Sequence, residues 1–73
     1  MTRKHDGELV EYRYDVVDID NCGWYVARIG ANGNVIEDSQ KLWFPVDVDG
    51  YDDEDDLAAA LREAFPGATV RAA

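Results

Sequence analysis

Basic residues and long apolar runs are both scarce in this chain of 73 residues. Seven lysines and arginines stand against sixteen aspartates and glutamates, so the net charge is −9. This balance argues against direct nucleic-acid binding, which requires a basic surface. The longest apolar run, Leu42–Val46, is far too short to span a bilayer. We therefore expect neither a nucleic acid nor a membrane as the partner.

Cysteine and histidine occur only once each, as Cys22 and His5. A single cysteine allows neither an intrachain disulfide nor a multi-thiolate metal site, and we expect a cytoplasmic protein. His5 lies in the polar stretch 1–8, where we expect a flexible N-terminal tail and a solvated imidazole. Because the sequence shows no catalytic motif, we expect a non-enzymatic protein without metal or cofactor.

Hydrophobic patterning predicts one small domain over residues 9–73. Apolar residues alternate with polar ones from Val10 to Val16 and then change phase, which predicts a first strand with a bulge near Val16–Val17. A turn is expected at 20–23, and 24–29 is rich in aromatic and β-branched residues, as a second strand would be. Asn32-Gly33 predicts a two-residue type I′ turn into a third strand. The cross-strand pairs expected from that turn are Ile29 with Ile36, Arg28 with Glu37 and Trp24 with Lys41.

The second half of the chain predicts a helix beside the sheet. Residues 42–48 alternate again and suit either a fourth strand or an extension of the third. Asp52 is the expected N-cap of a helix that ends at Pro66-Gly67, and a last strand is expected at 68–72. The order β-β-β-(β)-α-β predicts an α+β fold, in which one helix packs on one face of a three- to five-stranded antiparallel sheet. Leu57, Ala60, Leu61, Ala64 and Phe65 form the expected buried stripe of the helix.

Acidic side chains are most concentrated in residues 47–56, which we call the acidic segment. One or two carboxylates at a helix N-terminus interact favourably with its dipole, but a longer run repels itself. We expect the carboxylates of the segment to be regularly spaced along a strand end and a helix start, at intervals comparable to those between phosphates on DNA. Trp43 and Tyr51 flank the segment, either as packing residues or as aromatic anchors of an interface. The carboxylates are those of Asp47, Asp49, Asp52, Asp53, Glu54, Asp55 and Asp56.

In size, charge and organisation the chain resembles the small acidic inhibitors of phages and mobile elements, including DNA-mimic anti-restriction and anti-CRISPR proteins. The resemblance implies that it occludes the basic surface of a nucleic-acid-binding protein, such as a CRISPR-Cas effector or a restriction enzyme, as a monomer or weak homodimer. Two alternatives stay open: a salt-adapted domain of a halophile, and an immunity or antitoxin protein against a basic nuclease. Asp47, Asp49 and Asp56 also match three positions of a calcium-binding loop, but Pro45 at its first position cannot supply a ligand.

Overall fold

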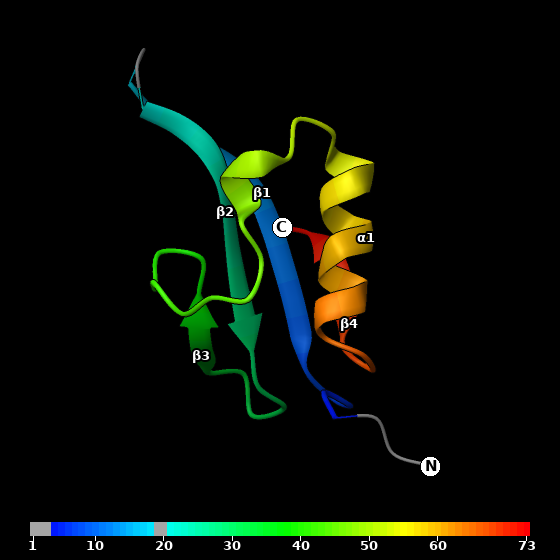
Figure 1. The fold of residues 1–73 in the computed structure, drawn as a ribbon. Helices are drawn as coiled ribbons and strands as arrows, with labels where there is room; N and C mark the ends of the chain where they lie inside the picture. The colour runs from blue at the N-terminus through cyan, green and yellow to red at the C-terminus, as the bar shows by residue number, and fades with distance from the viewer. Residues whose placement is uncertain (1–3, 19–20) are drawn as a thin grey trace.

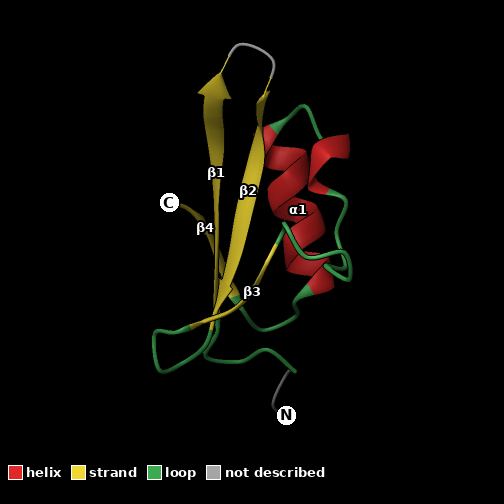
Figure 2. Cartoon of the chain, turned by 90° about the vertical axis from the view of Figure 1, so that its left-hand side faces the viewer, coloured by secondary structure: helices red, strands yellow, loops and turns green. Residues whose placement is uncertain are grey.

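The structure is a computed structural model that describes residues 4–18 and 21–73. Its elements, in chain order, are β1 (Leu9–Asp18), β2 (Asn21–Ile29), β3 (Val35–Asp38), the 3₁₀ turn η1 (Val48–Gly50), α1 (Glu54–Ala64) and β4 (Thr69–Ala72) (Figure 1). The four strands form one sheet in the order β3-β2-β1-β4, and α1 packs on one of its faces (Figure 2). The predicted α+β class and the predicted order of strands and helix are therefore confirmed.

The sheet is mixed, whereas we expected an antiparallel one. β1 pairs antiparallel with β2 but parallel with β4, with Leu9 opposite Thr69 and Tyr12 opposite Ala72. A parallel neighbour requires a crossover connection, and α1 supplies it. The helix returns the chain to the end of the sheet where β1 starts. There the His5 amide, just before β1, donates a hydrogen bond to the Pro66 carbonyl, just after the helix.

The β1–β2 hairpin carries the predicted bulge. The pairing register shifts between Val16 and Asp18, which reconciles the two apolar phases of β1. β2 starts earlier than expected, since Cys22 pairs with Val16 and Gly23 with Asp15 inside the ladder. Asn21, the first residue of β2, pairs with Asp18 as well, so the predicted turn at 20–23 is wrong for its last three residues, and its first residue, Asp20, lies outside the described residues.

The β2–β3 connection differs from a type I′ turn. The Gly33 amide donates to the Gly30 carbonyl over 2.9 Å, and Gly33 has a φ of +89°, whereas Asn32 has none of the positive φ that type I′ requires. Next to this loop Ile29 faces Val35 rather than the predicted Ile36, and an irregularity between Arg28 and Ile29 then restores the predicted register. The predicted Arg28–Glu37 pair does form.

The chain leaves the sheet after Asp38. The Asp38 carboxylate accepts a hydrogen bond from the Gln40 amide over 3.0 Å and turns the backbone away from β2. The predicted pair of Trp24 with Lys41 therefore does not form. The predicted strand over residues 42–48 does not form either. Pro45, which has no amide hydrogen, lies in this connection. The connection still contributes to the core through Phe44, Val46 and the buried Val48.

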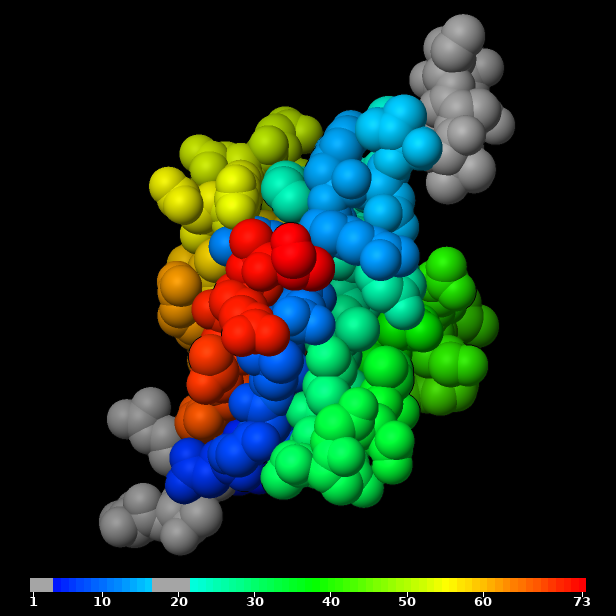
Figure 3. All heavy atoms as spheres, turned by 180° about the vertical axis from the view of Figure 1, so that it is seen from behind, coloured from blue at the N-terminus to red at the C-terminus, as the bar shows by residue number. Residues whose placement is uncertain are grey.

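The core lies between α1 and the even-numbered residues of the central strands. Asp53 caps the helix, because its carboxylate accepts from the Asp55 amide over 2.8 Å, so the predicted cap at Asp52 is off by one residue. The buried residues of the core are Val10, Tyr12, Val26, Val48, Leu57, Ala58, Leu61 and Phe65. Of the predicted stripe, Ala60 is only half-buried and Ala58 takes its place in the core. The opposite face of the sheet lies at the molecular surface (Figure 3).

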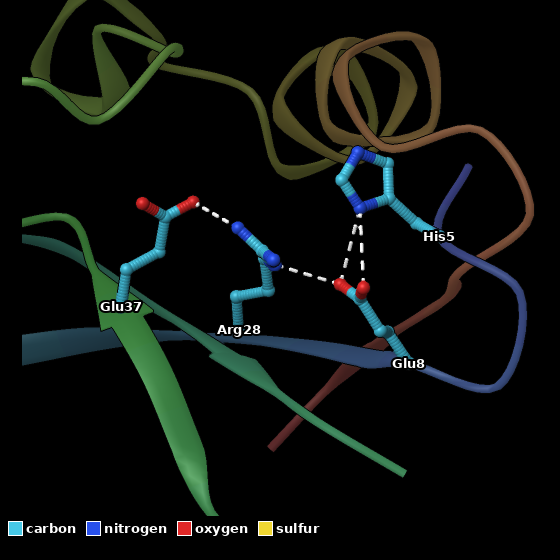
Figure 4. A network of polar contacts seen from close by, with 4 residues as sticks. All are labelled: His5, Glu8, Arg28 and Glu37. Carbon is cyan, nitrogen blue, oxygen red and sulfur yellow. Dashed lines mark hydrogen bonds and ion pairs between the residues drawn. The ribbon is translucent and has the colours of Figure 1, made fainter.

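A chain of polar contacts ties the N-terminal segment to the sheet (Figure 4). His5 is only 7% exposed, packs edge-on against Phe65 at 5.2 Å and contacts the Glu8 carboxylate at 3.2 Å. Arg28 donates to both Glu8 and Glu37 over 2.6 Å. Burial alone would raise the pKa of Glu8, but the hydrogen bonds from Arg28 and His5 outweigh it and lower that pKa. The expected solvated imidazole at His5 is therefore wrong; residues 1–3 lie outside the described part of the chain.

Candidate functional site

The acidic segment is anchored to the core at three points. Val48 and Leu57 are buried, and Tyr51 packs against the same cluster. The Trp24 indole N–H donates to the Tyr51 carbonyl over 2.9 Å, which joins the segment to β2. Two of these apolar anchors, Val48 and Tyr51, lie within the segment and Leu57 directly follows it, so both ends of the run of five acids at 52–56 are attached to the core.

The carboxylates occupy five backbone environments rather than one regular row, and three of them, on Glu54, Asp55 and Asp56, lie in the first turn of α1. Asp47 precedes η1, Asp49 lies within it, Asp52 follows it, and Asp53 caps the helix. All seven acidic residues are exposed. The expected strand spacing between Asp47 and Asp49 is wrong, because a 3₁₀ turn replaces the strand there. Asp52 likewise precedes the helix, so it has no helical spacing to Asp55 and Asp56.

The negative charge of the segment is not compensated by the cations of the described residues. None of its seven carboxylates forms an ion pair there. Three arginines pair with other acids: Arg13 with Asp15, Arg28 with Glu8 and Glu37, and Arg71 with Glu11. The charge is therefore available to an external cation.

Glu54 lies near the sheet as well as in the first turn of α1. Burial raises the pKa of Tyr12, and the negative charge of the neighbouring Glu54 carboxylate raises it further. Among the seven acids, Glu54 is thus close enough to β1 to act on Tyr12.

The two aromatic residues that flank the segment behave differently. Tyr51 is half-buried and packs on the core, as its structural interpretation predicts. Trp43 is 70% exposed beside the fully exposed Leu42, so core or edge packing is wrong for it. The Lys41 ammonium lies 5.9 Å from the centre of the Trp43 ring. Trp43 therefore belongs to an exposed apolar tip.

A groove of about 810 Å³ lies between the end of the β1–β2 hairpin and the acidic segment, and it reaches past the outer edge of β2 to Ser39 and Gln40. Residues on its β2 side include Cys22 and Trp24, and Asp49 and Asp52 come from the acidic segment. A Cβ placed on Gly23 would lie 3.2 Å from the Asp49 carboxylate oxygen, so Asp49 lies directly against β2. The sequence did not predict this groove. Its existence depends on β3 being shorter than β2, which only the turn residues Asp38–Gln40 indicate.

Tyr14 and Cys22 lie together at the groove. The Tyr14 hydroxyl donates to the Cys22 sulfur over 3.3 Å. This hydrogen bond raises the pKa of Tyr14, and the charge of Asp52 adds a smaller effect in the same direction. The Tyr14 hydroxyl therefore keeps its proton near neutral pH and remains a hydrogen-bond donor at the groove.

Within residues 4–18 and 21–73, no group of three or more histidine, cysteine, aspartate or glutamate side chains is arranged to hold a metal ion. No helix in the same residues is long and apolar enough to cross a membrane. Comparison of the chain with protein-family models, with curated proteins and with solved structures finds no significant match. The acidic segment and the groove are therefore the candidate functional features of the described residues.

Proposed function

We propose that this chain is a non-enzymatic cytoplasmic binding protein that occupies the basic surface of a nucleic-acid-binding protein through the acidic segment. A CRISPR-Cas effector or a restriction enzyme is the kind of target we have in mind. The observation that carries the proposal is that seven exposed carboxylates, fixed on an ordered backbone, have no ion-pair partner within the described chain.

Electrostatics favours such a partner. Concentrated charge of one sign steers an oppositely charged surface into contact and raises the association rate. The irregular spacing of the carboxylates means that the proposal rests on local charge density rather than on a copy of the phosphate interval. Since exposed charges are screened beyond about 8 Å at physiological ionic strength, the partner must approach the segment closely.

Affinity capture at two ionic strengths tests the proposal. The wild-type chain and the variant D52N/D53N/D55N/D56N would be immobilised, and proteins retained at about 0.05 M salt would be eluted at about 0.5 M. Asparagine also caps helices, so the variant should keep its fold, which far-UV circular dichroism checks. We expect the wild type to retain a basic protein and to compete with DNA for it, and the variant to do neither.

A charge-matched pair of variants separates a local surface from net charge. D55N/D56N removes two charges from the acidic segment, whereas E11Q/E63Q removes two from elsewhere. We expect the first pair to weaken competition with DNA and the second to leave it nearly unchanged. Equal effects of the two pairs, or a fully active D52N/D53N/D55N/D56N variant, would refute the assignment to this segment.

A further inference from the structure

The outer edge of β2 lacks a neighbouring strand along half its length. β3 pairs only with Ala27–Ile29, so residues 22–25 have β1 on one side and no strand on the other, where the groove extends to Ser39 and Gln40. Figure 1 shows β2 continuing well beyond the point where β3 has left the sheet. The described chain therefore contains a sheet edge with room beside it.

The hydrogen bonds of Val26, the last residue of β2 with a partner on its outer side, show which backbone groups face this groove. Val26 uses both of its backbone groups on the outer side: its carbonyl accepts from the Ser39 amide over 2.9 Å, and its amide donates to the Ser39 hydroxyl over 3.0 Å. Backbone direction alternates along an antiparallel strand. The amides and carbonyls of Trp24 and Cys22 consequently point the same way, into the groove, and no backbone group in the described residues pairs with them.

We propose that this edge binds an extended cationic segment of the partner as an added strand. The proposal rests on the proposed function and specifies how the basic partner is held. An added strand would lie about 4.8 Å from β2 and satisfy the outward groups of Cys22 and Trp24. Asp49 and Asp52 border the same groove, and arginine or lysine side chains on alternate positions of the segment would meet them.

Charge selects this occupant over a second copy of the chain. Two copies joined edge to edge would bring two acidic borders together in a protein of net charge −9, which opposes pairing. A basic extended segment meets complementary charge at the same place. Unpaired strand edges are common sites of strand addition, and neighbouring side chains then set which segment is accepted.

The probe is a short synthetic peptide of alternating arginine and valine, titrated into the full ¹⁵N-labelled chain at low salt. We expect hydrogen exchange of the Trp24 and Cys22 amides to slow on binding. A peptide N-methylated on the bonding edge should bind much more weakly, because it loses its backbone donors. D49N/D52N should weaken binding about fivefold, the effect of losing two exposed ion pairs, and D55N/D56N, with the same charge change outside the groove, should have a smaller effect.

Three results would overturn the inference. The first is no binding of the peptide. The second is binding without protection of the two amides, or with equal weakening by both double variants; cationic recognition would then survive, and the proposed function with it, but not strand addition. The third is protection of these amides by self-association without peptide, which sedimentation detects. Failure of the proposed function is recognised separately, by the absence of a DNA-competing basic protein in the capture experiment.

Discussion

Replacement of Arg28 by methionine should destabilise the domain far more than an equivalent change at the surface. Arg28 donates to Glu8 and Glu37 over 2.6 Å, and all three side chains are less than a fifth exposed. Breaking a fully buried ion pair costs about 3–5 kcal/mol, and a fully exposed one contributes at most about 1 kcal/mol. The intermediate exposure of this network places the expected loss at about 2–3 kcal/mol. Methionine keeps an apolar stem and removes only the charged group, whose guanidinium carbon also lies 5.8 Å from the centre of the Phe65 ring, so most of the loss reports the charge.

Urea unfolding followed by tryptophan fluorescence at about pH 7 measures this loss, which corresponds to a fall of about 10–20 °C in Tm. R71M is the matched control, because Arg71 pairs with Glu11 at an exposed position and its removal should cost less than about 1 kcal/mol. If R28M is no less stable than R71M, the network contributes nothing beyond a surface pair and the reasoning is refuted.

The pH dependence provides a second check on the same network. Glu8 has a pKa lowered from its ordinary value of 4.5 in the folded state, so its ionised form stabilises the fold above that value. This stability is lost as the pH falls through the lowered pKa. In R28M the main cause of the lowering is gone. The stability gap between wild type and R28M should therefore narrow as the pH falls from about 7 to about 3, and a gap of constant size would contradict the assignment.

Three further changes test the fold and the anchoring of the acidic segment. L61A should cost about 2–5 kcal/mol because Leu61 is fully buried, whereas L42A at a fully exposed position should cost under about 0.5 kcal/mol; similar losses in urea unfolding would contradict the core assignment. G33A should cost about 1 kcal/mol in thermal unfolding, because the φ of +89° disfavours alanine although nothing lies within 4 Å of its added Cβ; an unchanged Tm would contradict this. W24F should cost about 1 kcal/mol by removing the hydrogen bond to Tyr51 and should speed amide exchange between η1 and α1; unchanged exchange would show that this bond does not hold the segment.

The elements of the fold could be predicted wherever a period is long and regular. Alternation around Val10 and Tyr12 predicts β1, and the spacing of Leu57 and Leu61 predicts α1. The parallel pairing of β1 with β4 could not be predicted from the alternation, because an alternating strand has the same sequence pattern in either orientation. Orientation depends on the length and path of the connection between the strands, which lies in the packing of α1.

The candidate site was only half visible in the sequence. The acidic segment could be identified from the composition of residues 47–56 alone. The groove depends on where β3 ends, and a single side-chain hydrogen bond from the Gln40 amide to Asp38 decides that. The burial of His5 was missed because a short polar stretch carries no periodic signal. Its burial against Phe65 exists only once both ends of the domain have come together, although its contact with Glu8 is local in sequence.

The parallel pairing of β1 with β4 also constrains the order in which the domain assembles. Its contacts join residues far apart in the chain, as in the Arg71–Glu11 pair at a separation of 60, whereas β1 and β2 are neighbours in sequence. Closing so long a loop costs more entropy than forming a hairpin, so the hairpin should form early and β4 should dock late. Until docking occurs, β1 presents a bare edge of its own, and this intermediate is the state in which the chain is most exposed to misassembly.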